Sequence, residues 1–223
     1  MPTVLITGAS RGIGLGLVRH YAAAGWQVLA CCREPEAVDA PDGVERIALD
    51  VADDARIAAL ADGLAGRPID LLINNAGIYG PRDAVVGNVK SADWLEVLRV
   101  NTIAPMMVTQ ALLPNIRAGN RKIIAIVSSK VGSIADNSSG NSYIYRSSKT
   151  AVNQVSKSLS IDLRAEDITV VALHPGWVQT DMGGPNALIS TETSIDGMTA
   201  LLDRLTPDDS GKFFNYDGAE IPW

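Results

Sequence analysis

The chain has 223 residues, which is enough for one well-packed α/β domain and too few for a comfortable second one. Hydrophobic residues make up 47% of the chain and charged residues 20%, as in ordinary folded soluble proteins. The net charge of −6 argues against nucleic acids and anionic membranes as partners. The first apolar run is too short for a membrane span or a secretion signal, so we expect a single cytoplasmic domain over residues 1–223.

Strand-like and helix-like segments alternate along the whole chain. In chain order, the pattern predicts a strand at Thr3–Thr7, a helix at Ile13–Ala24, strands at Gln27–Cys32 and Glu45–Leu49, a helix at Asp53–Leu64, a strand at Asp70–Asn74, a long helical region from about Ala92 to Arg117, a strand at Lys122–Val127, a helix at Tyr143–Ala165, a strand at Ile168–Leu173 and a short last strand at Gly211–Asn215. The polar stretches Ser133–Ser142 and Gly183–Ser194 are predicted to be loops.

The predicted strands are continuous apolar runs, as expected when helices cover both faces of a parallel sheet. Repeated βα units predict an α/β fold with a doubly wound, Rossmann-type parallel sheet. Both predicted loops follow strands, so they should lie at the carboxyl edge of the sheet, where ligands bind in such folds.

Cysteine and histidine are scarce. Cys31 and Cys32 are adjacent, and strand neighbours point to opposite faces, so a structural disulfide between them is implausible and a reducing compartment is expected. His20 and His174 lie far apart in the sequence. We therefore predict no metal site.

Gly8, Gly12 and Gly14 lie between the first predicted strand and the first predicted helix. Glycine lets backbone approach a pyrophosphate closely, and a helix N-terminus offers free N–H groups and a positive dipole end. Because position 17 is Leu17, the strict G-x-G-x-x-G pattern is not met, and a purely structural turn is the alternative. The position of the turn favours dinucleotide binding.

The end of the second predicted strand indicates which dinucleotide binds. Proteins that prefer NAD place an acid about 20 residues beyond the glycines, whereas here Arg33 follows the strand. A guanidinium suits a 2′-phosphate, and Arg11 in the glycine turn could add a second positive charge. We therefore predict NADP(H) in preference to NAD(H). The alternative is that both arginines are solvated and that Glu34 binds a ribose.

Tyr145 and Lys149 are four residues apart on a predicted helix and should share a face. A neighbouring ammonium favours phenolate, so the pKa of Tyr145 is expected to fall towards working pH. Such a tyrosine serves as a general acid or base for a carbonyl oxygen. Tyr-x-x-x-Lys also occurs by chance on many helices, so the pair needs support from other motifs.

Asn101 precedes Pro105 by four residues, and proline has no N–H to donate to the Asn101 carbonyl. One interpretation is a kink that leaves this carbonyl free to bind water. The other is that Pro105 simply ends one helix and begins the next.

Six motifs occur in one order and at compatible spacings: Thr7–Gly14, Asn74-Asn75-Ala76-Gly77, Asn101, Ser128-Ser129, Tyr145-x-x-x-Lys149 and Pro175-Gly176. The series resembles the short-chain dehydrogenase/reductase family over essentially the whole chain. The stretches 145–153 and 217–223 resemble a narrower group that includes bacterial C-factor proteins and sniffer-type carbonyl reductases.

The resemblance implies roles for the matching residues. The pyrophosphate and nearby phosphate would be held by Gly8, Ser10, Arg11, Ile13 and Gly14. The adenine would meet Asp50 and Val51, the adenosine and ribose would lie along Asn75, Ala76 and Gly77, and the nicotinamide would be flanked by Pro175, Gly176, Val178 and Thr180. In the chemistry, Ser129 would polarise the substrate carbonyl, Tyr145 would donate the proton, Lys149 would bond the nicotinamide ribose, and Asn101 would complete a proton relay through water.

Two departures from the family pattern concern the substrate side. Ser129 lies sixteen residues before Tyr145, where many family members have about thirteen, and Ser128 is its rival for the same role. The 183–194 segment is short where the family often has a longer helical lid, so the pocket is expected to be open. Its apolar lining is predicted to be Ile134, Tyr143, Trp177 and Met182, with no lysine or arginine obviously placed for a carboxylate, which favours uncharged aldehydes and ketones.

These observations predict an NADPH-dependent carbonyl reductase, with Tyr145 as the proton donor and a homodimer suggested by family habit. The alternative is a nucleotide-binding regulatory or signalling protein with little turnover, because fold does not settle function.

Overall fold

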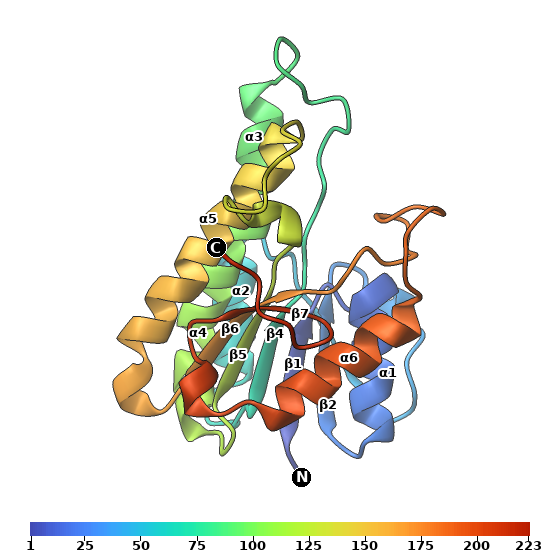
Figure 1. The fold of residues 1–223 in the computed structure, drawn as a ribbon. Helices are drawn as coiled ribbons and strands as arrows, with labels where there is room; N and C mark the ends of the chain where they lie inside the picture. The colour runs from blue at the N-terminus through green and yellow to red at the C-terminus, as the bar shows by residue number, and fades with distance from the viewer.

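Seven strands form the centre of the computed structural model, which describes residues 1–223 with the exception of the side chain of residue 37. The strands are β1 (Thr3–Thr7), β2 (Gln27–Cys32), β3 (Glu45–Ala48), β4 (Leu71–Asn74), β5 (Ile123–Val127), β6 (Thr169–His174) and β7 (Phe213–Asn215). They make one parallel sheet in the order β3-β2-β1-β4-β5-β6-β7 (Figure 1). The order reverses between β1 and β4, which is where doubly wound folds bind their ligands.

Helices cover both faces of the sheet, as predicted. On one face lie α1 (Gly12–Ala23) and α6 (Thr191–Arg204), which pack against each other (Figure 1). On the other lie α2 (Asp54–Gly63), α4 (Ala104–Ala118) and α5 (Tyr143–Asp162). The helix α3 (Ser91–Leu98) and the start of α5 project beyond the sheet. Short helical turns complete the fold: η1 (Pro35–Ala37), η2 (Arg99–Ile103), η3 (Lys130–Gly132), η4 (Arg164–Glu166) and η5 (Pro207–Asp209).

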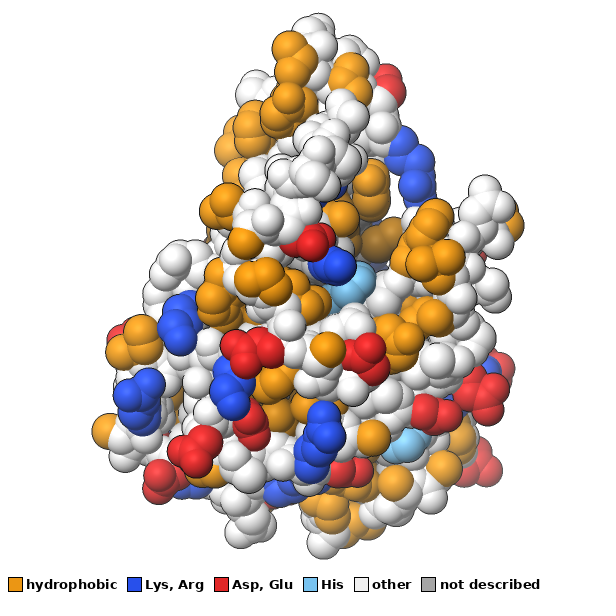
Figure 2. Space-filling view, viewed as in Figure 1, with side chains coloured by type: hydrophobic (Ala, Val, Ile, Leu, Met, Phe, Trp, Pro, Cys, Tyr) orange, Lys and Arg blue, Asp and Glu red, His pale blue; other side chains and the backbone are white. Residues whose placement is uncertain are grey.

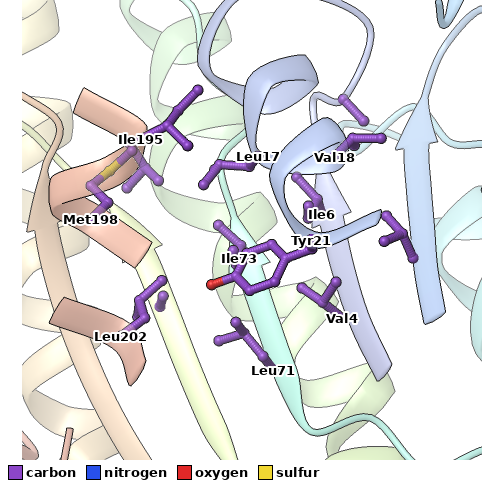
Figure 3. Close-up of a cluster of buried hydrophobic side chains, with 14 of the residues drawn as sticks. Val4, Ile6, Leu17, Val18, Tyr21, Leu71, Ile73, Ile195, Met198 and Leu202 are labelled. Atoms are coloured by element: carbon purple, nitrogen blue, oxygen red, sulfur yellow. The ribbon is translucent and has the colours of Figure 1, made fainter. Parts of the chain in front are cut away.

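Strand residues divide between two apolar clusters according to the period of two. Val4 and Ile6 pack with α1 and α6, whereas Leu5 between them packs with the helices of the opposite face. Figure 3 shows the first cluster, to which α1 contributes Tyr21, α6 contributes Met198, and β1 contributes Val4 and Ile6. Burial of both faces explains the continuous apolar strands. The exception is β3, which forms one edge of the sheet and is largely exposed.

The long helical region predicted from about Ala92 to Arg117 is divided into three parts. Between α3 and α4 the five residues of η2 form a π-helical turn, in which the Ala104 N–H donates to the Arg99 carbonyl. Pro105 lies in the first turn of α4, where its missing N–H is tolerated. The sequence allowed a kink or a junction at Pro105. The structure shows a π-helical turn centred on Asn101.

One helix was not predicted. The predicted loop at 183–194 ends early because α6 begins at Thr191, with the Ser190 hydroxyl accepting a hydrogen bond from the Thr193 N–H. Other boundaries differ from the predicted ones by one to three residues, as is usual for frayed ends. None of the helices in the described part of the chain is both long and apolar enough to span a lipid bilayer.

Candidate active site

A cleft of about 460 Å³ runs along the carboxyl ends of strands β1 to β6. Most residues predicted to bind the cofactor line it: Gly8, Ser10, Arg11, Ile13, Gly14, Arg33, Asp50, Val51, Asn75, Ala76, Gly77, Tyr145, Lys149, Pro175 and Thr180. The other two predicted cofactor residues, Gly176 and Val178, are not in the lining. Val178 is buried and bridges to Ile189, while Gly176 takes a left-handed φ of 87° against Tyr216.

The glycine turn is packed too tightly for side chains. A Cβ on Gly14 would lie 2.2 Å from the Gly8 carbonyl oxygen, and Gly8 has a φ of 67°. The Asn75 amide ties the turn to β4 by donating to the carbonyls of Thr7 and Gly8, at 2.9 and 3.2 Å. The bare backbone at the start of α1 therefore faces the cleft, which fits the pyrophosphate of a dinucleotide.

At the far end of the cleft, Arg33 and Cys32 are both in the lining, and Glu34 is not. Arg33 is exposed, and none of the ion pairs among the described residues involves it. Its charge is therefore available to a ligand. Arg11 differs, because its Nη1 lies 3.1 Å from the Asp181 carboxylate in the segment after β6. The second positive charge predicted for the phosphate end is thus partly neutralised.

Tyr145 and Lys149 share one face of α5, as predicted, and the Lys149 ammonium nitrogen lies 5.7 Å from the centre of the Tyr145 ring. Burial lowers the pKa of Lys149 to about 8. Its Nζ donates a 2.9 Å hydrogen bond to the Val127 carbonyl. Burial raises the pKa of Tyr145 to about 12, with Ser129 opposing this shift through a hydrogen bond. The predicted fall in the pKa of Tyr145 is therefore wrong, because loss of solvation on burial outweighs the opposing effect of Ser129.

The two serines after β5 face different partners. The Ser128 hydroxyl donates to the Asn153 side chain at 2.5 Å and is buried. Ser129 is also buried, and its side chain lowers the pKa of the Tyr145 phenol. Ser128 is in the cleft lining and Ser129 is not, but only Ser129 acts on the phenol.

The Asn101 side chain fastens three segments together. Its amide donates to the Ile78 carbonyl at 2.8 Å and to the Ser148 hydroxyl at 3.0 Å, and its oxygen accepts from the Ile78 N–H at 2.8 Å. All of its side-chain hydrogen-bonding groups are thus engaged within the protein. The proton relay through water that the family resemblance implies for Asn101 stays a prediction.

Two residues that sequence analysis did not single out, Tyr79 and Arg82, lie beside Tyr145 and outside the cleft lining. The Tyr79 ring stacks on that of Tyr145 with centroids 4.4 Å apart and planes at 22°. The Arg82 guanidinium lies over the Tyr79 ring, 4.8 Å from its centroid. Tyr79 follows the Asn75-Ala76-Gly77 motif by two residues, and this position in the sequence was the one indication that it could lie near the active site.

Of the four predicted substrate residues, Met182 lines the cleft. The others are exposed and are not in its lining: Ile134 at 72%, Trp177 at 49% and Tyr143 at 40%. Their role in binding substrate stays a prediction. Arg146, the next residue after Tyr145, donates to the Val131 carbonyl and the Ser139 hydroxyl.

Comparison with known proteins identifies the class of enzyme. A family model described as short chain dehydrogenase matches residues 2–188. The chain belongs to the short-chain dehydrogenase/reductase family. It is therefore an oxidoreductase, and the resemblance seen in its six motifs is confirmed.

Relatives of this short-chain dehydrogenase include C-signal of Myxococcus xanthus, 46% identical over 165 residues that cover 74% of this chain and 99% of that protein. Among solved structures, the carbonyl reductase Sniffer of D. melanogaster matches with a TM-score of 0.94 and 33% identity, covering 100% of both chains. An NADPH-bound carbonyl reductase from chicken fatty liver matches with a TM-score of 0.90 and 36% identity, covering 100% of this chain and 99% of that one.

Proposed function

We propose that this short-chain dehydrogenase reduces an aldehyde or ketone to an alcohol with NADPH, and that Tyr145 donates the proton. The observation that carries the proposal is that Tyr145 and Lys149 line one end of a cleft whose other end presents Arg33, with Ser129 acting on the Tyr145 phenol. The structural likeness to carbonyl reductases, one of them NADPH-bound, supports the same reaction.

NADPH held in the cleft would supply the hydride. Ser129 holds the carbonyl oxygen beside the phenol, and the Tyr145 proton moves to that oxygen as negative charge develops on it. With a pKa of about 12, Tyr145 carries this proton throughout the neutral range. The charged form of Lys149 then stabilises the phenolate that remains, because its Nζ lies 5.7 Å from the centre of the Tyr145 ring.

Replacing the proton donor tests this role. Tyr145→Phe removes only the hydroxyl, so the fold and NADPH affinity should survive while turnover falls by about a hundredfold or more. The measurement is NADPH oxidation with a panel of aldehydes and ketones. Tyr21→Phe is the matched control, because it removes a buried hydroxyl from α1 outside the cleft. Substantial turnover in Tyr145→Phe would mean that another group supplies the proton.

Cofactor preference rests on Arg33 in the same way. A charge-assisted contact to a 2′-phosphate is worth about 1.5–3 kcal/mol, so NADPH should bind tens-fold more tightly than NADH. Arg33→Asp should erase or reverse this preference, whereas Arg56→Asp, on the exposed side of α2, should leave it intact. Equal dissociation constants for the two cofactors in the unmodified protein would contradict the assignment.

A signalling role without significant turnover is the second candidate, and the name of the C-signal relative is the observation that favours it. The same panel separates the two candidates. Tight NADPH binding with no oxidation above background, for every aldehyde and ketone tried, would favour the signalling role.

A further inference from the structure

Arg82 is linked to the proposed proton donor by two ring contacts. Its guanidinium carbon lies 4.8 Å from the centre of the Tyr79 ring, and that ring stacks on Tyr145 at 4.4 Å. The Tyr79 hydroxyl is hydrogen-bonded to the Ser142 hydroxyl at 3.1 Å, which fixes the ring beside the start of α5. The stack therefore holds a cation at a set position relative to the phenol.

A hydrogen bond joins the same guanidinium to a residue of the cleft lining. The Arg82 Nη2 donates to the Met182 carbonyl at 2.6 Å, and Met182 lines the cleft. Arg82 follows β4 and Met182 follows β6, so this contact joins the two segments that flank the entrance. Figure 2 shows a hollow with mainly hydrophobic walls on this side of the molecule and Lys or Arg side chains on its rim.

The charge of Arg82 is not neutralised by the protein. Arg11 pairs with Asp181 and Lys130 with Asp136, but none of the ion pairs among the described residues involves Arg82. The adjacent Asp83 carboxylate accepts instead from Asn88, at 3.0 Å. A guanidinium has five N–H donors, and the Met182 carbonyl uses one. The remaining donors form a fork suited to a carboxylate.

We propose that Arg82 binds an anionic group of the substrate, a carboxylate by preference, at a position remote from the carbonyl that is reduced. The proposal rests on the proposed function and specifies its substrate class. A 2-oxo acid would bring its carboxylate to Tyr145 rather than to Arg82, so the acid must be separated from the carbonyl by a spacer. The Tyr79 ring and Met182 provide apolar surface for an aromatic spacer. The proposal departs from the prediction, made from the sequence, that no basic residue is placed for a carboxylate.

The test compares 4-formylbenzoate with its methyl ester, which has the same aldehyde and ring but no charge. The quantity measured is the ratio of kcat/KM for the acid to that for the ester, with NADPH in excess. Arg82→Gln should lower this ratio by about tenfold or more, and Arg82→Lys should retain part of it. Arg56→Gln removes an equal charge from the exposed side of α2 and should keep the ratio of the unmodified protein. Raising the ionic strength should reduce the ratio only where residue 82 is cationic.

Each outcome decides the proposal. The same ratio in Arg82→Gln and in the unmodified protein would overturn it, while reduction of the ester would leave the proposed function standing. An equal loss with acid and ester would show that Arg82 only holds the Met182 segment, and would also overturn it. If neither compound is reduced, the aldehyde and ketone panel decides the proposed function, and calorimetric titration of 4-formylbenzoate and the ester into the NADP⁺-saturated protein decides the role of Arg82. Arg82→Gln should weaken binding of the acid and not of the ester, and unchanged binding of the acid would overturn the proposal.

Discussion

At the scale of single residues, the active site shows how burial can reverse an expectation drawn from charge. Four-residue spacing correctly placed Lys149 beside Tyr145. The spacing could not indicate that neighbouring elements bury Lys149 and half-bury Tyr145, which raises the pKa of the phenol and lowers that of the ammonium. Each group is thus biased towards its neutral form in the protein by itself.

The buried ammonium predicts a dependence of stability on pH. Lys149 has an ordinary pKa of 10.5, against about 8 in the folded protein, so the unfolded chain binds the extra proton between these values. Stability should therefore rise with pH through this window, and the charged form should cost up to about 3 kcal/mol below it. Lys149→Met removes the ammonium. The free energy of unfolding of this variant, relative to that of the unmodified protein, should therefore be highest near pH 7 and should decline between pH 8 and 10. Urea denaturation at pH 7, 8.5 and 10 measures the difference, and a difference that does not vary with pH would contradict the prediction.

Sequence motifs identified the cleft residues whose positions are set by local structure. Examples are the glycine turn and the residues that follow β3 and β4. They could not identify Tyr79 and Arg82, whose contacts with Tyr145 and Met182 join segments 66 and 100 residues apart. These residues lie in a stretch without helical or strand periodicity, so nothing in the local pattern fixes where their side chains point.

At the scale of elements, η2 connects the helical layer to the active site. Proline at position 105 indicated a disturbance at Asn101, and the π-helical turn is its physical form. The turn presents the Asn101 side chain to both Ile78 and Ser148, so a single residue couples the segment after β4 to α5. The sequence could not choose between kink and junction, because both are compatible with the missing N–H of proline.

Asn101→Ala should therefore affect stability as well as activity. It removes three hydrogen bonds and leaves the backbone of Ile78 and the Ser148 hydroxyl without this partner, which should cost about 2–3 kcal/mol. Asn88→Ala is the matched control, because that amide is exposed and bonds only within its own loop. Equal urea midpoints for the two variants would show that the hydrogen bonds of the Asn101 side chain contribute little to stability.

At the scale of the whole molecule, the order of strands and the coverage of both faces follow from apolar runs joined by right-handed crossovers. The helix α6, which the sequence analysis did not predict, could have been expected from the same rule. Two neighbouring parallel strands such as β6 and β7 need a crossover of a dozen residues or more. Its buried residues Ile195, Met198 and Leu202 also follow helical spacing. The sequence could not show which helix α6 packs against. A Cβ on Gly16 of α1 would overlap Ile195 of α6, so glycine at position 16 permits the close approach of these two helices.

The layer formed by α1 and α6 buries a phenol oxygen, that of Tyr21, among apolar side chains. Tyr21 is 1% exposed, and its hydroxyl has no hydrogen-bond partner among the described residues, with Leu71, Ile73 and Leu202 close by (Figure 3). Burial raises the pKa of this phenol, so it remains neutral. Tyr21→Phe keeps the ring and removes the unsatisfied group, so it should stabilise the protein by about 1 kcal/mol. Tyr143→Phe, whose residue is 40% exposed, should change stability very little. Thermal and urea unfolding provide the measurement, and a destabilised Tyr21→Phe would mean that the hydroxyl is bonded, for instance to a buried water.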